Sequence, residues 1–342
     1  MCPALEVVEP GLMTTVQDFG RYGHQAQGVP VSGALDPGSL RLANALVGND
    51  QGAGGLEIRV LGPTLKVVSS SVRVALCGTD CAIEFVGERR VPVASNRSVL
   101  LQKGQIIRIG HVSDSAVCYL AVEGGFDLPP LYGSQSTYLA GKMGGFEGRA
   151  LQKGDCLKLA RDVDDVEIIR LCPEPFLPSR TGKIRVVLGP QDDYFGTEAI
   201  TGFLSQTYRI SQEANRMGVR LLGEPIGHLK GADINSDGIV TGSIQIPGNG
   251  LPIILLADHQ TTGGYPKIAT VIRADVARLG RMVPGSELSF LKVGIEDAEE
   301  AAIAQDNRIR QAIASIVSVT GEDGLYDYML QNSNLVCGAV AE

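Results

Sequence analysis

One turn-and-strand phrase occurs three times in this chain of 342 residues. It reads LLQKGQIIRIG at residues 100–110, ALQKGDCLKLA at 150–160 and VPGSELSFLKV at 283–293. Each copy places a glycine shortly before a segment in which apolar and polar residues alternate, as they do in a strand with one buried face. Repetition of such a unit favours a barrel or a sandwich over a parallel α/β sheet. The chain is therefore predicted to be mainly β.

A proline-rich segment divides the sequence. CPEPFLPSRTG, residues 172–182, carries three prolines within six residues, which is typical of a domain boundary. The boundary predicts an N-terminal β subdomain at residues 1–172 and a second β subdomain at residues 183–296. Residues 297–342 form a C-terminal extension, predicted to be a packing or interface element. Its amphipathic helix is expected to end near Gly321 and is marked by apolar residues at helical spacing: Ala298, Ala302, Ile309, Ala312, Ile313 and Ile316.

Composition excludes several classes of protein. With 44% hydrophobic and 20% charged residues the chain is typical of soluble globular proteins, and its net charge of −8 is unsuited to binding nucleic acid or anionic lipid. No signal peptide and no membrane span are recognised, so a cytoplasmic location is expected. The seven cysteines are scattered, unlike a disulfide framework. The phosphate-loop pattern G-x4-G-K-[ST] is not found, so any ATP would be bound in another way.

The segment LPIILLADHQTTGGYPK, residues 251–267, is the first candidate site. A short apolar strand ends in a run of polar residues, although the glycines and proline that follow already supply the geometry of a turn. The polar run consists of Asp258, His259, Gln260, Thr261 and Thr262. It is either a ligand-binding or catalytic loop, or a solvated loop with an Asx-type turn at Asp258.

A second polar cluster lies near the beginning of the chain. Asp36 as the N-cap, Pro37 at the first helical position and Gly48 at the end predict an ordinary helix between them. The loop before this helix is unusual, because many donors and acceptors alternate with glycines in it. Long loops of this kind are uncommon in compact domains unless they bind something. The polar residues of this loop are Gln17, Asp18, Arg21, Tyr22, His24 and Gln25.

Four long motifs carry a family resemblance. They are residues 11–49, EGGFDLPPLYGSQSTYLAGKMGG at 123–145, SQEANRMGVRLLG at 211–223, and SDGIVTGSIQIPGNGLPIILLADHQTTGGYPKIATVI at 236–272. In this order, between about residues 10 and 290, they resemble the allophanate hydrolase subunit 2 family, also called the biotin-dependent carboxyltransferase family. The resemblance implies that both subdomains have the character of a cyclophilin-like barrel.

The resemblance also implies a function. Bacterial members include the C subunit of the ATP-dependent 5-oxoprolinase, a cyclic amide hydrolase that opens 5-oxo-L-proline to L-glutamate. For this chain we therefore expect activity only with partner subunits A and B, with ATP and Mg²⁺ as cofactors of the assembled enzyme. Two alternatives stay open: a carboxyltransferase component of a biotin-dependent urea carboxylase, and a non-catalytic regulator that antagonises a kinase inhibitor. The sequence AGKMGG around Lys142 lacks the methionine that precedes a biotinylated lysine, so this chain is not the biotin carrier.

Residue types suggest the roles within the lactam-opening reaction. Amide resonance protects the ring carbonyl, so phosphorylation of its oxygen needs positive charge around the phosphates and groups that move protons. The expected catalytic residues are Asp258, His259 and Asp18. The expected substrate- or phosphate-binding residues are Arg21, Asn215, Arg216, Gln260, Thr261, Thr262, Tyr265 and Lys267; no metal ligands are assigned.

Two further expectations follow. The loops at residues 17–25 and 258–265 should line a common cleft if they serve one site. Substitutions of Asp258 by Asn and of His259 by Gln should reduce turnover at least tenfold and leave stability almost unchanged, because surface substitutions away from special features are nearly neutral.

Overall fold

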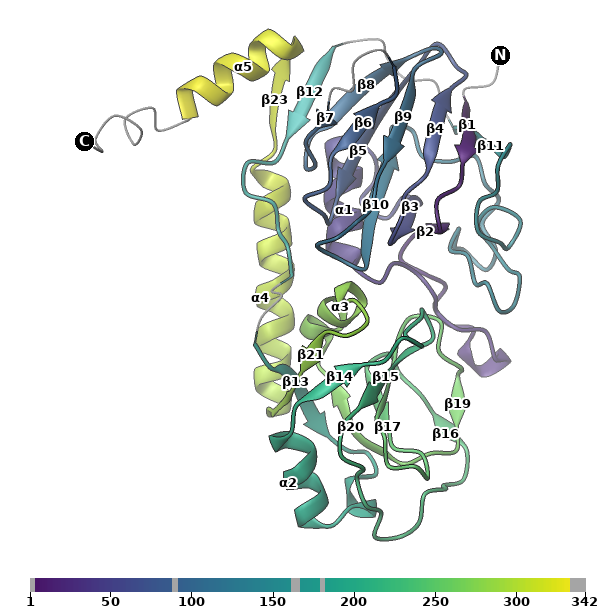
Figure 1. Ribbon diagram of the computed structural model, residues 1–342, viewed down its shortest axis with the longest axis vertical. Helices are drawn as coiled ribbons and strands as arrows, with labels where there is room; N and C mark the ends of the chain where they lie inside the picture. Colours follow the sequence, from purple (N-terminus) through teal and green to yellow (C-terminus); the bar gives the residue numbers. More distant parts are fainter. Residues whose placement is uncertain (1–3, 88–91, 161–166, 179–181, 333–342) are drawn as a thin grey trace, which may run out of the picture.

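The computed structural model describes residues 4–87, 92–160, 167–178 and 182–332. Two β-rich halves lie one above the other, and a long helix, α4 (Ile295–Ala314), runs alongside both (Figure 1). The mainly β fold class is confirmed. None of the helices in these ranges has the length and apolar character needed to cross a membrane.

The first half contains two antiparallel sheets. The six-stranded sheet has the order β11-β1-β4-β9-β6-β7, and the five-stranded sheet has the order β2-β3-β10-β5-β8. A hydrophobic core with residues from both sheets lies between them. The strands are β1 (Ala4–Glu9), β2 (Met13–Gln17), β3 (Gly55–Arg59), β4 (Thr64–Val67), β5 (Ser71–Cys77), β6 (Ile83–Phe85), β7 (Pro92–Val93), β8 (Ser98–Gln102), β9 (Ile106–Ile109), β10 (Val117–Val122) and β11 (Cys156–Lys158).

The central strands β5 and β10 are buried on both faces. Their alternate residues belong to two different cores, because successive side chains of a strand point to opposite sides of the sheet. On β10, Leu120 joins the core between the sheets, while Tyr119 joins the core on the other face. Helix α1 (Pro37–Leu46), which begins after its predicted N-cap Asp36, contacts β5 and β10 and contributes to that second core.

The second half is built around an eight-stranded sheet with the order β21-β14-β15-β18-β17-β20-β13-β22. Its two edge strands, β21 (Glu287–Leu288) and β22 (Phe290–Lys292), are separated by a single residue, Ser289. The sheet must therefore curl until its edges approach each other, which makes it a nearly closed barrel. The other strands are β13 (Ile184–Leu188), β14 (Tyr208–Ile210), β15 (Gly218–Leu222), β17 (Ser243–Gln245), β18 (Ile253–Leu255) and β20 (Lys267–Val271).

Smaller elements complete this half. A two-stranded sheet joins β16 (Asp237–Gly238) to β19 (Thr262–Gly263). Helix α3 (Arg273–Arg281) lies between the barrel and the first half, and α2 (Thr197–Ser205) packs on β22 (Figure 1). Two short 3₁₀ turns are η1 (Gln25–Gln27) and η2 (Asp192–Tyr194).

The three repeated phrases behave as predicted. Gly104, Gly154 and Gly285 have φ values of 84°, 88° and 88°, a left-handed conformation that glycine adopts without steric cost. The first two glycines precede β9 and β11, which belong to the same six-stranded sheet. The third precedes β21 at the edge of the barrel.

The C-terminal extension differs from its prediction in one respect. The helix does not continue to Gly321: α4 ends at Ala314, and β23 (Val317–Thr320) follows it. Two valines alternate with polar residues in VSVT, a pattern that suits a strand, and β12 (Ile168–Leu171) offers an antiparallel partner. Helix α5 (Gly321–Asn332) comes next. The division of the chain at residues 172–183 stays a proposal.

Candidate functional site

Asp18 fixes one polar loop to another. Its Oδ1 accepts hydrogen bonds from the hydroxyls of Ser134 and Ser136, at 2.6 and 2.5 Å, and from the Gly20 amide at 2.7 Å. Its Oδ2 accepts from the Gln135 amide at 2.6 Å. The carboxylate is buried and holds two of the family motifs together, so its oxygens are committed to fixed donors.

Arg21 follows three residues later and is 1% exposed. Its Nη2 donates to the Ser136 carbonyl, while Nε and Nη1 are buried without any hydrogen-bond partner. Burial lowers the pKa of this guanidinium, and the nearby Asp18 and Asp258 carboxylates oppose that shift. Buried donors without partners are costly, because a desolvated polar group loses its hydrogen bonds to water. Arg21 is therefore suited to receive an anionic or carbonyl group of a ligand.

Arg216 lies at the centre of a buried ionic network. It binds Asp258 through two parallel hydrogen bonds, Nε to Oδ2 at 2.8 Å and Nη2 to Oδ1 at 3.0 Å. Its Nη1 donates to Glu57 Oε1 at 2.5 Å, and its Nη2 also donates to the Gly33 carbonyl at 2.7 Å. Burial disfavours the charged guanidinium, but the carboxylates of Glu57 and Asp258 outweigh it and raise the pKa of Arg216.

The network continues through the first half of the molecule. Glu57 Oε2 accepts a hydrogen bond from the Tyr119 hydroxyl at 2.7 Å, and that hydroxyl accepts one from the Asp36 amide at 2.9 Å. The Asp36 carboxylate in turn accepts from Arg281 at 3.1 Å. Burial raises the pKa of Tyr119 well above its ordinary value. Because Arg216, Asp258 and Arg281 belong to the second half, the network joins the two halves; its members from the first half are Glu57, Tyr119 and Asp36.

His259 is also buried, with 3% of its surface exposed. Its Nδ1 lies 2.6 Å from the carbonyl oxygen of Gln260. A carbonyl can only accept, so Nδ1 carries the hydrogen and Nε2 keeps a lone pair, the tautomer required of a general base. Burial lowers the pKa of His259 below its ordinary 6.5, which keeps the ring neutral near pH 7.

This lowered pKa predicts a pH dependence of stability. Between the folded and unfolded pKa values the unfolded chain binds more protons, so the contribution of His259 is complete above about pH 6.5 and is lost as the pH falls through the folded pKa. We expect His259→Gln to lose less unfolding free energy than the wild type between pH 7.5 and 5.5. Urea unfolding at both pH values measures this difference. Equal losses in the two proteins would contradict a buried neutral imidazole.

The remaining predicted site residues do not join the cluster of Asp18, Arg21, Arg216, Asp258 and His259. Asn215 is exposed, and its Oδ1 accepts from the amides of Met217 and Gly218, which makes it a turn residue. Lys267 is 2% exposed and binds Asp237 Oδ2 at 2.6 Å and the Gly238 carbonyl at 3.0 Å. Gln260, Thr261, Thr262 and Tyr265 lie on the loop that includes β19, where they are exposed or half-buried.

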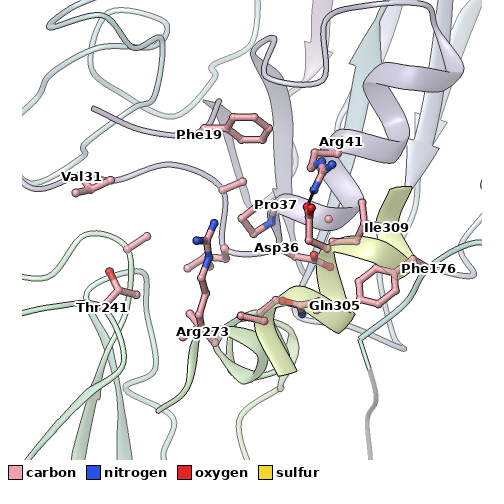
Figure 2. Close-up of a pocket in the computed structure, with 18 of the residues that line it drawn as sticks. Phe19, Val31, Asp36, Pro37, Arg41, Phe176, Thr241, Arg273, Gln305 and Ile309 are labelled. Atoms are coloured by element: carbon pink, nitrogen blue, oxygen red, sulfur yellow. Dashed lines mark hydrogen bonds and ion pairs between the residues drawn. The ribbon is translucent and has the colours of Figure 1, made fainter. Parts of the chain in front are cut away.

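A large cavity, of about 1110 Å³, lies between the two halves beside this cluster (Figure 2). Phe19 and Tyr22 of the first polar loop line it, but from the second loop only the preceding Ala257 does so. This cavity is therefore not a cleft lined by both loops, and the expectation of a common cleft stays a prediction. The loops do meet through their backbones, since the Ser32 amide donates to the Ala257 carbonyl at 3.0 Å.

Comparison with known proteins identifies the family. A family model described as the carboxyltransferase domain, subdomain A and B, matches residues 27–292. The chain belongs to this carboxyltransferase family. The resemblance drawn from the sequence motifs is thereby confirmed.

Members of the carboxyltransferase family with different names are similar to this chain. It is 35% identical over 307 residues to the C subunit of 5-oxoprolinase from Escherichia coli (strain K12), covering 90% of this chain and 97% of that protein. It is 30% identical over 363 residues to urea amidolyase of Lachancea kluyveri, covering 97% of this chain but only 20% of that protein. The structure of Kluyveromyces lactis urea carboxylase matches with a TM-score of 0.82 and 29% identity, over 95% of this chain and 30% of that one.

Two corrections apply to the site as it was predicted from residue types. Asp258 is 3% exposed and paired with Arg216, so a substitution there cannot be neutral for stability as a solvated turn would be. Sequence reasoning also missed Glu57, Tyr119 and Asp237. Glu57 was detectable, because a glutamate inside the apolar strand segment GLEIR needs a buried positive partner.

Proposed function

We propose that this chain is the C subunit of a multi-subunit, ATP-dependent 5-oxoprolinase, which opens 5-oxo-L-proline to L-glutamate together with subunits A and B. The observation that carries the proposal is the match, at 35% identity, to 97% of the length of a 5-oxoprolinase C subunit. The site is compatible with this chemistry, since it offers buried positive charge beside a neutral imidazole.

The reaction assigns different tasks to these groups. Transfer of the terminal phosphoryl group of ATP to the ring carbonyl oxygen leaves ADP and makes the carbonyl carbon electrophilic. A water then adds, and the ring C–N bond breaks as the nitrogen takes up a proton, which gives a γ-glutamyl phosphate. A second water cleaves this acyl phosphate to L-glutamate and inorganic phosphate. The unpaired donors of Arg21 bind the substrate carboxylate or the phosphate. His259 accepts a proton from the attacking water at Nε2. Asp18 and Asp258 act as positioning residues, because their oxygens are already held by fixed donors.

ATP and Mg²⁺ belong to the assembled enzyme in this proposal. Within the described ranges no three His, Cys, Asp or Glu side chains come together in a way that could hold a metal ion. We therefore assign no magnesium ligand to this chain.

The second candidate is the carboxyltransferase component of a biotin-dependent, urea carboxylase-type enzyme. The description of the matching family model and the TM-score of 0.82 with a urea carboxylase favour it. In that case biotin would carry the carboxyl group, and the same cluster would bind its ureido ring or the acceptor amide.

Reconstitution separates the candidates. We expect the purified chain alone to hydrolyse neither ATP nor 5-oxo-L-proline, and turnover to appear only when subunits A and B are both added, because the proposed reaction is shared between subunits. Glutamate and ADP release measure it, with the A and B pair alone as control. Robust turnover by the chain alone would overturn the multi-subunit assignment. Carboxylation of urea with a biotin carboxylase, without turnover in the A and B mixture, would establish the second candidate.

A further inference from the structure

Three parts of the chain supply most of the walls of the cavity between the halves, and single residues such as Phe19, Phe176 and Thr241 complete the lining. The segment before α1 and the start of that helix form one wall, and α3 with the end of β20 forms another. The third wall is α4, which lies beyond residue 292, where the family model stops. A volume of about 1110 Å³ lies just above the usual range for small-molecule sites, so the cavity admits a ligand much larger than one water or ion.

One wall presents an unpaired positive charge. Arg273, the first residue of α3, points into the cavity (Figure 2). Among the described residues its guanidinium has no hydrogen bond and no ion pair. The carboxylates of the walls are engaged: Asp306 binds Arg41 at 2.6 Å and Arg310 at 2.7 Å, while Asp36 binds Arg281. Two arginines share one carboxylate and a third has none, so the cavity carries an excess of positive charge.

A second polar group in the cavity also lacks a partner. Ser32 lines it, is 5% exposed, and has a buried hydroxyl without any hydrogen bond. In addition, the N-cap residue of α3 is Ile272, whose side chain cannot accept a hydrogen bond, so the first amides of α3 are not satisfied by a side chain of the N-cap. These donors have in common that a negatively charged oxygen would satisfy them.

The rest of the wall is apolar. Leu35, Phe176, Val276 and Ile309 line the cavity together with the ring of Phe19. Such a surface favours an organic body over a hydrated inorganic ion, because apolar area is removed from water when the body binds.

We propose that this cavity binds a small organic anion, with its carboxylate or phosphate on Arg273 and its apolar or planar body between α1, α3 and α4. This site is separate from the buried cluster around Arg21 and Arg216, and it does not depend on the proposed lactam-opening function. A carboxylate ligand and a phosphate ligand would both present a negatively charged oxygen group on a carbon skeleton.

Calorimetric titration of the purified full chain tests the site with three probes. 5-Oxo-L-proline supplies a carboxylate, adenosine monophosphate supplies a phosphate on a planar body, and inorganic phosphate has no body. We expect at least one of the two organic probes to bind more tightly than inorganic phosphate, and to bind more weakly as ionic strength rises. Binding of 5-oxo-L-proline would indicate that the natural ligand carries a carboxylate. Binding of adenosine monophosphate would indicate that it carries a phosphate. Absence of binding by both organic probes, or equal binding of inorganic phosphate, would overturn the proposal.

Matched variants locate the binding. Arg273→Gln should weaken the bound probe at least tenfold, whereas Arg209→Gln, at an exposed arginine paired with Glu287 on the barrel, should leave affinity unchanged. Ala302→Trp, which places a large ring in the cavity from α4, should abolish binding while the circular dichroism spectrum stays that of the wild type. Unchanged affinity in Arg273→Gln would refute the site whether or not the reconstituted enzyme is active.

Discussion

Replacement of Arg216 by leucine is expected to lower the free energy of unfolding by about 3–5 kcal/mol, since removal of one partner leaves buried charges without compensation. Two carboxylates, Glu57 and Asp258, depend on this guanidinium, and all three side chains are 4% exposed or less. Urea unfolding followed by circular dichroism measures the change.

Arg220→Leu is the matched control for this experiment. Arg220 pairs with Glu213 at 3.1 Å, but these side chains are 54% and 74% exposed. Exposed ion pairs contribute little, so a change within about 0.5 kcal/mol is expected. If Arg216→Leu were as mild as Arg220→Leu, the buried network would not be what joins the halves.

Loss of the imidazole at residue 259 is expected to have the largest effect on activity. In the reconstituted 5-oxoprolinase, His259→Gln should reduce 5-oxoproline-dependent ATP hydrolysis about a hundredfold or more, which is the usual contribution of a proton-transfer group. Glutamine can still donate to the Gln260 carbonyl, so the loop should hold while the basic nitrogen is lost. Steady-state kinetics of the assembled enzyme give the effect on kcat.

His228 offers a control in the same half of the molecule. Its Nε2 lies 2.9 Å from the Ile246 carbonyl, and its ring packs near Phe195 with centroids 5.3 Å apart. We expect His228→Gln to change stability but to leave kcat within about threefold of the wild type, a shift of under 1 kcal/mol in the barrier. Normal turnover by His259→Gln, measured with equal subunit assembly, would remove His259 from the catalytic groups.

Local signals in the sequence predicted the local parts of the structure. Asp36, Pro37 and Gly48 marked the limits of α1, because caps and breakers act on neighbouring backbone groups. The glycine-led phrases predicted β9, β11 and β21 for the same reason. The end of α4 could not be predicted from its own residues, since the strand that follows pairs with β12, far away in the sequence.

The sequence identified several residues of the site but not the contacts among them. Asp18, Arg21, Arg216 and Asp258 were singled out as polar residues within motifs, and the structure brings them together. Their partners were not foreseeable in the same way: Arg216 and Glu57 are 159 residues apart, and no periodic pattern links them. The hydrogen-bond partners of a site residue determine its role, because a carboxylate held by two fixed donors differs in function from one that faces solvent.

The proline-rich segment at residues 172–182 divides the sequence, but the hydrophobic core is not divided at the same place. One continuous hydrophobic cluster contains Leu40 and Tyr119 from before it, Ile184 and Phe290 from after it, and Ile309 from α4. Neither half could be separated from the other without exposing a large apolar face to water. The proline-rich segment is thus a boundary proposed from the sequence, whereas the two halves share one hydrophobic core, and a hinge motion between them would have to expose part of that core to water.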